Sequence, residues 1–191
     1  MTNSVQALDR RLTATAVVRK VAAVLGGALL VAFGAQASVP LPGTPVPITL
    51  QVPAVLIVGG LLGPRLGAAS LVTYLLAGAA GLPVFAPIGL PGVARLFGPT
   101  GGYLLALPLA AAIAGRAAIP PVRWTRLAVG LVLATVTIHA GGVAQLAILG
   151  GDLRVAVGIG SVPFLFGDVA KLLVAGLVIG RYATPIRRAL L

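Results

Sequence analysis

The chain has 191 residues, of which 59% are hydrophobic and 9% are charged. Globular domains carry about 25% charged residues, so this composition excludes an ordinary soluble domain and predicts one integral membrane bundle over residues 1–191. The formal net charge of +11 would suggest nucleic acid as a partner of a soluble protein. Here the basic residues lie between apolar runs, so they predict membrane orientation and no nucleic acid partner.

The first apolar run covers residues 21–37 and predicts the first membrane helix. Its end, Ala35-Gln36-Ala37, is similar to a signal-peptidase site, but the charge distribution is better explained if the run remains as a helix. Small residues recur four apart within it, and Ala28 and Ala32 form one such pair. Residues of this kind and spacing allow close contact between membrane helices.

Five further apolar runs predict five more membrane helices, at 48–62, 66–82, 100–115, 127–150 and 162–180. The predicted fold is therefore an all-α membrane protein with six transmembrane helices. Several runs are shorter than the roughly 20 residues that span a bilayer, so we expect turns within the bundle to extend them. The connectors 38–47 and 83–99 are rich in proline and glycine, which forbids regular helix there.

Basic residues are distributed unevenly among the connections. If both termini lie on one side of the membrane, that side has eleven of them: Arg10, Arg11, Arg19, Lys20, Arg65, Arg116, Arg123, Arg126, Arg181, Arg187 and Arg188. The other side has Arg95 and Arg154, and Lys171 lies within a predicted helix. Because cytoplasmic loops carry the excess of Lys and Arg, we expect both termini to be cytoplasmic.

Two charged residues, Asp168 and Lys171, interrupt the last apolar run and share one face of the predicted helix. Each charge costs roughly 2.5–3.5 kcal/mol in hydrocarbon, so the two must pair, face a wet cavity or meet a polar ligand. The irregular connectors 38–47 and 83–99 lie on the same outer side, and irregular backbone at membrane depth needs a protein or cavity environment. These features predict an outward-facing pocket for a small solute, with a purely structural ion pair as the alternative.

The start of the last helix adds to this predicted pocket. Ser161 can cap the helix and Pro163 fits its first turn. The positive end of the helix would then lie near the pocket and favour an anionic group. Asp168 is expected about seven residues into the helix, roughly 10 Å from its start.

Four segments resemble one known family, in the same order along the chain: VPLPGTPVPITLQ (39–51), GPRLGAASLVTYLLAGAAGLPVF (63–85), GPTGGYL (98–104) and VPFLFGDVAK (162–171). The sequence resembles the BioY family, the biotin-binding S components of energy-coupling factor (ECF) transporters in prokaryotic plasma membranes. The resemblance covers nearly the whole chain. It departs at residues 142–146, where we expect an aromatic residue near Ala144.

The resemblance implies a multi-pass membrane subunit with six helices that captures biotin with high affinity near the extracellular side. Biotin is then a transported substrate, and no cofactor is implied. The implied partners are a transmembrane coupling protein and two ATPase subunits. The small-residue face of the first helix, with Ala28 and Ala32, is similar to the surface by which S components dock on the coupling protein.

The site roles that follow are hypotheses. A mostly apolar pocket with few polar anchors suits biotin. Lys171 is the candidate for the biotin carboxylate, because a charge-assisted hydrogen bond is strong. Asp168 either accepts hydrogen bonds from the ureido N–H groups or serves only as the counter-ion that orients Lys171. Arg95 either helps to attract or hold the carboxylate or contacts a lipid headgroup.

Four other polar side chains and one histidine complete the candidate set. Thr49, Gln51 and Tyr103 would donate to the ureido carbonyl or line the ring, and hydrogen bonding at helix ends is an equal alternative for them. Tyr74 belongs either to the pocket or to the core. His139 is interpreted as a hydrogen-bonded structural residue, since a lone histidine cannot build a metal site.

Other functions are weaker interpretations of the sequence. An intramembrane enzyme would need paired carboxylates, a zinc motif or Ser/His partners, and the chain has three acids, Asp9, Asp152 and Asp168. No GxxxxGK[ST] motif is present, so this chain is not itself an ATPase. A stand-alone ion-coupled carrier, a structural membrane subunit and an S component for another vitamin remain as alternatives.

Overall fold

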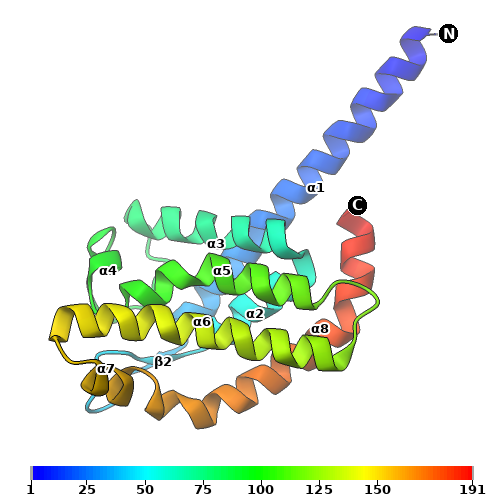
Figure 1. The fold of residues 1–191 in the computed structure, drawn as a ribbon. Helices are drawn as coiled ribbons and strands as arrows, with labels where there is room; N and C mark the ends of the chain where they lie inside the picture. The colour runs from blue at the N-terminus through cyan, green and yellow to red at the C-terminus, as the bar shows by residue number, and fades with distance from the viewer. Residues whose placement is uncertain (1, 191) are drawn as a thin grey trace.

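The structure is a computed structural model that describes residues 2–190, with side chains described from residue 14 onward. These residues form six helices of twelve or more residues, three shorter helical segments and one hairpin (Figure 1). The long helices are α1 (Thr2–Gln36), α2 (Gln51–Leu62), α3 (Pro64–Ala79), α5 (Gly101–Ala117), α6 (Trp124–Gly150) and α8 (Leu165–Leu190). The short elements are α4 (Ala94–Phe97), α7 (Leu153–Gly160), the 3-10 turn η1 (Val162–Phe164), β1 (Ser38–Val39) and β2 (Ile48–Thr49).

The chain is mostly helical, as the sequence predicts, and each predicted run overlaps one long helix. Three stretches have the length and hydropathy to cross a membrane: Ala14–Gln36, Trp124–Gly150 and Leu153–Leu190. By contrast, the 12 residues of α2 measure about 18 Å at 1.5 Å per residue, which is less than the roughly 30 Å of hydrocarbon. The predicted helix at 48–62 begins only at Gln51, because Ile48 and Thr49 pair with β1 as a strand.

The turn between α2 and α3 consists of a single residue, Gly63. Its φ of +89° lies in a region that L side chains avoid, so glycine is needed there. Pro64 then occupies the first turn of α3, where its missing N–H leaves no hydrogen bond unmade. The Gly-Pro dipeptide thus ends one helix and starts the next within one residue, and it sets α2 against α3.

Helices α2, α3 and α5 approach one another closely at glycines. A Cβ added at Gly59 of α2 would overlap the carbonyl oxygen of Ala111 in α5, and one added at Gly67 of α3 would lie 2.8 Å from the Cα of Gly59. Helices α5 and α3 also meet closely, since a Cβ added at Gly115 of α5 would lie 2.5 Å from the backbone nitrogen of Pro64 in α3. Small residues therefore let the backbones of three helices touch, as is typical of membrane bundles.

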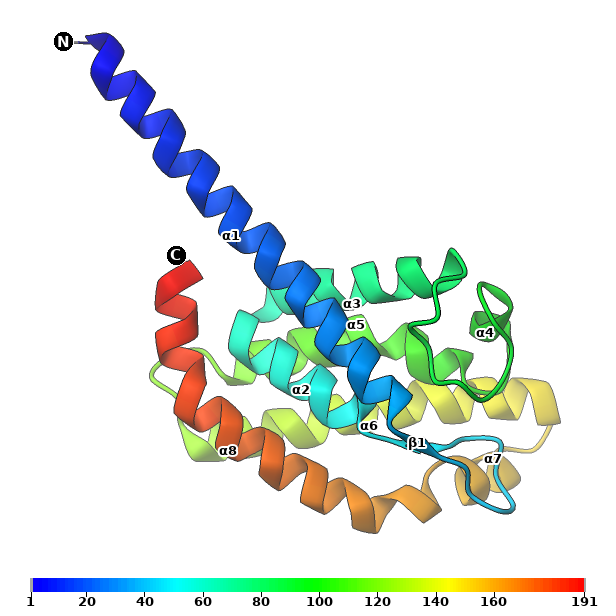
Figure 2. The ribbon, with the colours of Figure 1, turned by 180° about the vertical axis from the view of Figure 1, so that it is seen from behind.

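The two ends of the bundle differ in structure. The hairpin, α4 and α7 gather at one end, while both termini, the α2–α3 turn and the α5–α6 connection lie toward the other (Figures 1 and 2). Arg95 and Arg154 belong to elements of the first end. The irregular connectors that the sequence assigns to one side of the membrane are thus together in space.

The segment before α8 differs from the prediction. The predicted helices at 127–150 and 162–180 leave residues 151–161 as a loop between them, but α7 occupies most of this segment. Asp152 caps α7 by accepting from the backbone N–H groups of Arg154 and Val155 at 2.7 and 3.1 Å. The predicted capping of the last helix by Ser161 is wrong, because Ser161 makes no side-chain cap hydrogen bond there. Because the 3-10 turn η1 occupies the three residues before α8, Asp168 is the fourth residue of α8 and not about the seventh.

The small-residue face of α1 is turned inward. Ala28 and Ala32 are each only 9% exposed and belong to the hydrophobic core, whereas Leu25, Leu29 and Phe33 on the other face are 50%, 57% and 73% exposed. The position of Ala28 and Ala32 therefore does not support the predicted role in docking a partner. Their small size instead lets α1 pack closely within its own chain.

The glycine contact between α2 and α5 is testable with two alanine substitutions. Gly59→Ala should lower the free energy of unfolding by about 1–3 kcal/mol, because the added methyl group meets backbone atoms that cannot move aside cheaply. Gly26→Ala is the control, since nothing lies within 4 Å of its added Cβ and alanine favours helix. Thermal unfolding in detergent measures both, and equal midpoints for the two variants would contradict the close contact.

Candidate functional site

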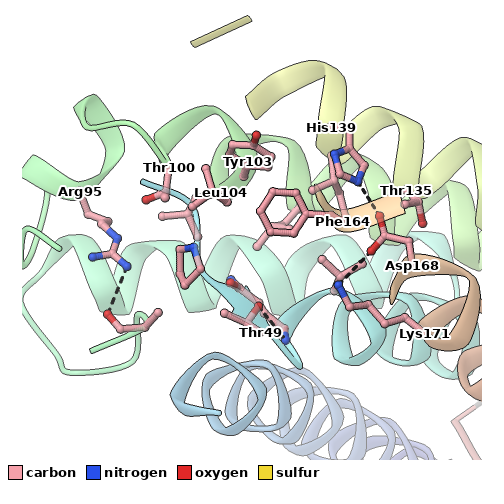
Figure 3. Close-up of a pocket in the computed structure, with 17 residues that line it drawn as sticks. Thr49, Arg95, Thr100, Tyr103, Leu104, Thr135, His139, Phe164, Asp168 and Lys171 are labelled. Carbon is pink, nitrogen blue, oxygen red and sulfur yellow. Dashed lines mark hydrogen bonds and ion pairs between the residues drawn. The ribbon is translucent and has the colours of Figure 1, made fainter. Parts of the chain in front are cut away.

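A cavity lies among the hairpin, the connector 83–99 and helices α2, α5, α6 and α8 (Figure 3). All six residues that the sequence analysis proposes for substrate binding line it, together with three further polar side chains. The polar lining consists of Thr49, Gln51, Arg95, Thr100, Tyr103, Thr135, His139, Asp168 and Lys171. The rest of the lining is apolar, which suits a solute with a hydrophobic body and few polar groups.

Asp168 is the centre of a hydrogen-bond network at one end of the cavity. Lys171 Nζ donates to Asp168 Oδ1 at 2.9 Å, and His139 Nε2 lies 2.7 Å from Asp168 Oδ2. On the other side of the ring, His139 Nδ1 lies 3.1 Å from Ser161 Oγ. A neutral His139 that donates from Nε2 to the carboxylate leaves Nδ1 free to accept from the serine hydroxyl. Each carboxylate oxygen therefore has a donor, which fixes the orientation of the carboxylate.

The local sequence explains why the pair of Asp168 and Lys171 forms. Residues three apart on a helix share a face, so Lys171 reaches back to Asp168 along α8. Asp168 lies in the first turn of that helix, where the positive end of the helix dipole stabilises a negative charge. The Asp168 side chain is 7% exposed and that of Lys171 13%. The ion pair is thus buried but borders the cavity, so its unused lone pairs and protons are available to a ligand.

Arg95 occupies the other end of the cavity (Figure 3). It is 5% exposed, and its guanidinium donates to the backbone carbonyls of Ile88 and of Ala86, the latter at 3.2 Å. Its Nε–H is buried and has no hydrogen-bond partner among the described residues. Burial lowers the pKa of Arg95, but a guanidinium keeps its proton in proteins. Arg95 is therefore a buried cation of the cavity lining that keeps one unpartnered donor.

Three predicted residues are engaged in hydrogen bonds within the chain as well as lining the cavity. Thr49 Oγ1 accepts from the backbone N–H of Gln51 at 3.3 Å, and Tyr103 donates to the carbonyl of Gly160 at 2.6 Å. Gln51 Nε2 donates to the hydroxyl of Tyr74 at 3.0 Å. Tyr74 itself is 1% exposed and belongs to the core, so it supports Gln51 from behind and does not line the cavity.

Sequence reasoning missed two features of the site. His139 is hydrogen-bonded, as expected, but it also borders the cavity and pairs with Asp168. Thr135, one turn earlier on α6, is 7% exposed, and its hydroxyl has no partner among the described residues. The spacing of four residues between them on one helix was the available signal. An unpartnered buried hydroxyl costs free energy, so Thr135 marks a place where a ligand group can complete the hydrogen bonding.

The aromatic residue expected near Ala144 has a counterpart from another helix. Ala144 itself is exposed on the outer face of α6. On the inner face, a Cβ added at Gly142 would overlap the ring of Tyr103, so glycine there makes room for an aromatic ring that α5 supplies. The difference from the family pattern at 142–146 thus leaves an aromatic wall in place.

The sequence matches the BioY family over residues 2–188. The chain belongs to this family. It is 40% identical to the biotin transporter BioY of Thermotoga maritima over 149 residues, which are 78% of this chain and 86% of that protein. It is 39% identical to a probable biotin transporter BioY of Pyrococcus horikoshii over 152 residues, which are 80% and 88% of the two chains.

The fold is also similar to a solved structure. The crystal structure of the S-component for biotin from an ECF-type ABC transporter superposes with a TM-score of 0.76, covering 86% of this chain and 90% of that chain at 24% identity. At this identity the likeness establishes the fold alone. Together with the apolar helices, the family membership identifies the chain as a membrane protein of the BioY family.

The unpartnered hydroxyl of Thr135 makes a prediction about stability without ligand. Thr135→Val should raise the free energy of unfolding by about 1 kcal/mol, because it replaces a buried hydroxyl that lacks a hydrogen bond by a methyl group of the same shape. Thr137→Val is the control, since that exposed hydroxyl donates to the carbonyl of Leu133 at 2.8 Å, and its loss should change stability by less than about 0.5 kcal/mol. Thermal unfolding of ligand-free protein measures both, and a destabilised Thr135→Val would show that the hydroxyl is satisfied in the native state.

Proposed function

We propose that this chain captures biotin with high affinity and is the substrate-binding subunit of an ECF-type ABC transporter. Two relatives that it resembles over most of their length are a biotin transporter and a probable biotin transporter. The observation that carries the proposal is a mainly apolar cavity with a buried guanidinium at one end and a buried acid–base pair at the other. Biotin has the same layout, with polar groups at both ends of an apolar body.

The carboxylate of biotin is assigned to the Arg95 end of the cavity. The sequence alone suggested Lys171 for this role, with Asp168 at the ureido group. Lys171 and Asp168 are in direct contact at 2.9 Å, so they lie at the same end and cannot hold opposite ends of an extended ligand. Arg95 is the remaining buried cation of the cavity lining, and its unpartnered Nε–H is suited to a charge-assisted hydrogen bond.

The ureido group is assigned to the Asp168 end. A ureido group presents two N–H donors and a carbonyl acceptor. Asp168 accepts from an N–H while the Lys171 ammonium or the Thr135 hydroxyl donates to the carbonyl. The net charge of the lining also matches that of biotin. Arg95, Lys171 and Asp168 together give the lining a charge of +1 with His139 neutral, and the single carboxylate of biotin neutralises it.

The side chains of Tyr103, Leu104 and Phe164 lie between the two polar ends (Figure 3) and would enclose the thioether ring and the aliphatic chain. Thr49 and Gln51 add polar groups to the wall on the side of α2. Burial of this apolar body supplies most of the binding free energy, at about 25 cal/mol per Å². The polar groups at the ends then select a ligand whose ends match.

The distribution of basic residues and the missing ATPase motif support a topology and a set of partners. The six long helices form one bundle in the plasma membrane of a prokaryote, in which the shorter helices reach the surface through the connectors that extend them. Both termini are cytoplasmic, which is supported by the excess of basic residues outside the hairpin end. The cavity then faces outward. The chain carries no ATPase motif, so ATP hydrolysis is supplied by two ATPase subunits through a transmembrane coupling protein. The chain itself is a transport subunit and not an enzyme.

Calorimetry of purified protein in detergent or nanodiscs tests the proposal. Wild-type protein should bind biotin one to one, and Asp168→Asn should weaken binding at least tenfold (about 1.4 kcal/mol), because it removes the anionic acceptor. Asp152→Asn removes the same charge at the exposed cap of α7, outside the cavity, and should leave the affinity within twofold. Thr135→Val should also weaken binding about tenfold even though it stabilises the free protein.

Three results would contradict the proposal in different ways. Well-folded protein that binds another vitamin and not biotin would make it an S component of different specificity. Uptake in cells that needs no ATPase subunits and collapses with an uncoupler would indicate an ion-coupled carrier. Equal losses in Asp168→Asn and Asp152→Asn would remove Asp168 from the binding site.

A further inference from the structure

A large groove lies at the end of the bundle opposite the cavity proposed for biotin. It encloses about 1070 Å³ between α1, the α2–α3 turn, the C-terminal end of α5 and the last turns of α8. Five cations from four helices line it: Lys20, Arg65, Arg116, Arg187 and Arg188. No acidic residue of the described chain is part of its lining. Among the residues with described side chains, the groove is thus a concentrated positive site whose lining holds no counter-ion.

Arg187 forms the floor of this groove. Its guanidinium donates to the carbonyl oxygens of Gly60 and Gly115 at 2.7 and 2.8 Å. These carbonyls belong to the last turns of α2 and α5, where backbone acceptors have no partner within the helix. Arg187 therefore joins three helices and covers the negative ends of two of them, so an anion that enters the groove does not meet bare carbonyls.

The other four cations are free to bind an external anion. In the part of the chain with described side chains, Lys20, Arg65, Arg116 and Arg188 have no hydrogen-bond or ion-pair partner, and each is exposed. Like charges gathered in one groove repel each other. An anion that binds all of them relieves this repulsion and gains charge-assisted hydrogen bonds, which arginine makes to phosphate in bidentate form.

The walls of the groove indicate that the anion belongs to a lipid. Between the cations they are apolar, with Leu62, Leu66, Ile119 and Leu190 among the lining residues. Along α1, the neighbours of Lys20 other than Arg19 are exposed and apolar, with Val17, Val18 and Val21 each more than half exposed. A free phosphate gains no binding energy from apolar walls, whereas the glycerol and acyl chains of a phospholipid would pack against them.

We propose that this groove binds the headgroup of an anionic phospholipid at the cytoplasmic face of the membrane. Arg65, Arg116 and Arg188 hold the phosphate above the floor made by Arg187, and Lys20 closes the groove from α1. Four unpartnered cations match two phosphates better than one, so a diphosphatidyl lipid such as cardiolipin binds more tightly than phosphatidylglycerol. Basic pockets between membrane helices on the cytoplasmic side recognise lipids of this class.

The test titrates purified full-length protein in detergent with cardiolipin, phosphatidylglycerol, phosphatidylcholine and inorganic phosphate, and follows binding by native mass spectrometry. The groove variant is Arg65→Gln/Arg116→Gln/Arg188→Gln. The control, Arg123→Gln/Arg154→Gln/Arg181→Gln, removes the same three charges at positions outside the groove lining. Wild type and control should bind cardiolipin with similar affinity, the groove variant should bind it at least tenfold more weakly, and phosphatidylcholine should not compete.

Several results would overturn this inference. Equal losses in the two triple variants would reduce lipid binding to a general effect of net charge. Full competition by inorganic phosphate at equal concentration would make the site one for a soluble anion. A groove variant that keeps its lipid but no longer co-purifies with the coupling protein would assign the groove to a partner protein. If the triple variant does not fold, Arg116→Gln alone should weaken cardiolipin binding about threefold, and an unchanged affinity would contradict the proposal.

Discussion

The carboxylate of Asp168 is the constraint on which the site depends. A charge within an apolar helix is costly unless it is paired, and here Lys171 comes from the same helix while His139 comes from α6. This arrangement ties α8 to α6 beside the cavity and leaves an acid–base pair bordering it. The helix that carries the pair can therefore be stable in the membrane and still present strong hydrogen-bonding groups to a solute.

The connector 83–99 holds a buried charge at the other end of the cavity. Connector 83–99 buries Arg95 among its own carbonyl oxygens, and Gln36 at the end of α1 donates to the carbonyls of Pro83 and Phe85 at 3.2 and 2.9 Å. Side chains here supply hydrogen bonds to backbone carbonyls that have no partner in regular structure. The connector thereby holds a cation that a helix in hydrocarbon would not easily bury.

Much of this arrangement could be predicted from the sequence. The cost of charge in hydrocarbon singled out Asp168 and Lys171, and apolar runs located the six long helices. The partners across helices could not be predicted, because His139 is 29 residues from Asp168 along the chain and nothing local to Thr135 signals an unpartnered hydroxyl. Ala28 and Ala32 illustrate a second limit. Small residues four apart indicate close helix packing, but they do not show whether the contact lies within the chain or with a partner.

The most direct test of the account is a binding comparison of biotin and biotin methyl ester on wild-type protein and Arg95→Met. If Arg95 holds the carboxylate, the ester should bind wild type at least tenfold more weakly than biotin does. Arg95→Met should then lose at least tenfold in biotin affinity but bind the ester within twofold of wild type. Equal losses for both ligands would make Arg95 a structural residue, and the same pattern in Lys171→Met would place the carboxylate at the other end of the cavity.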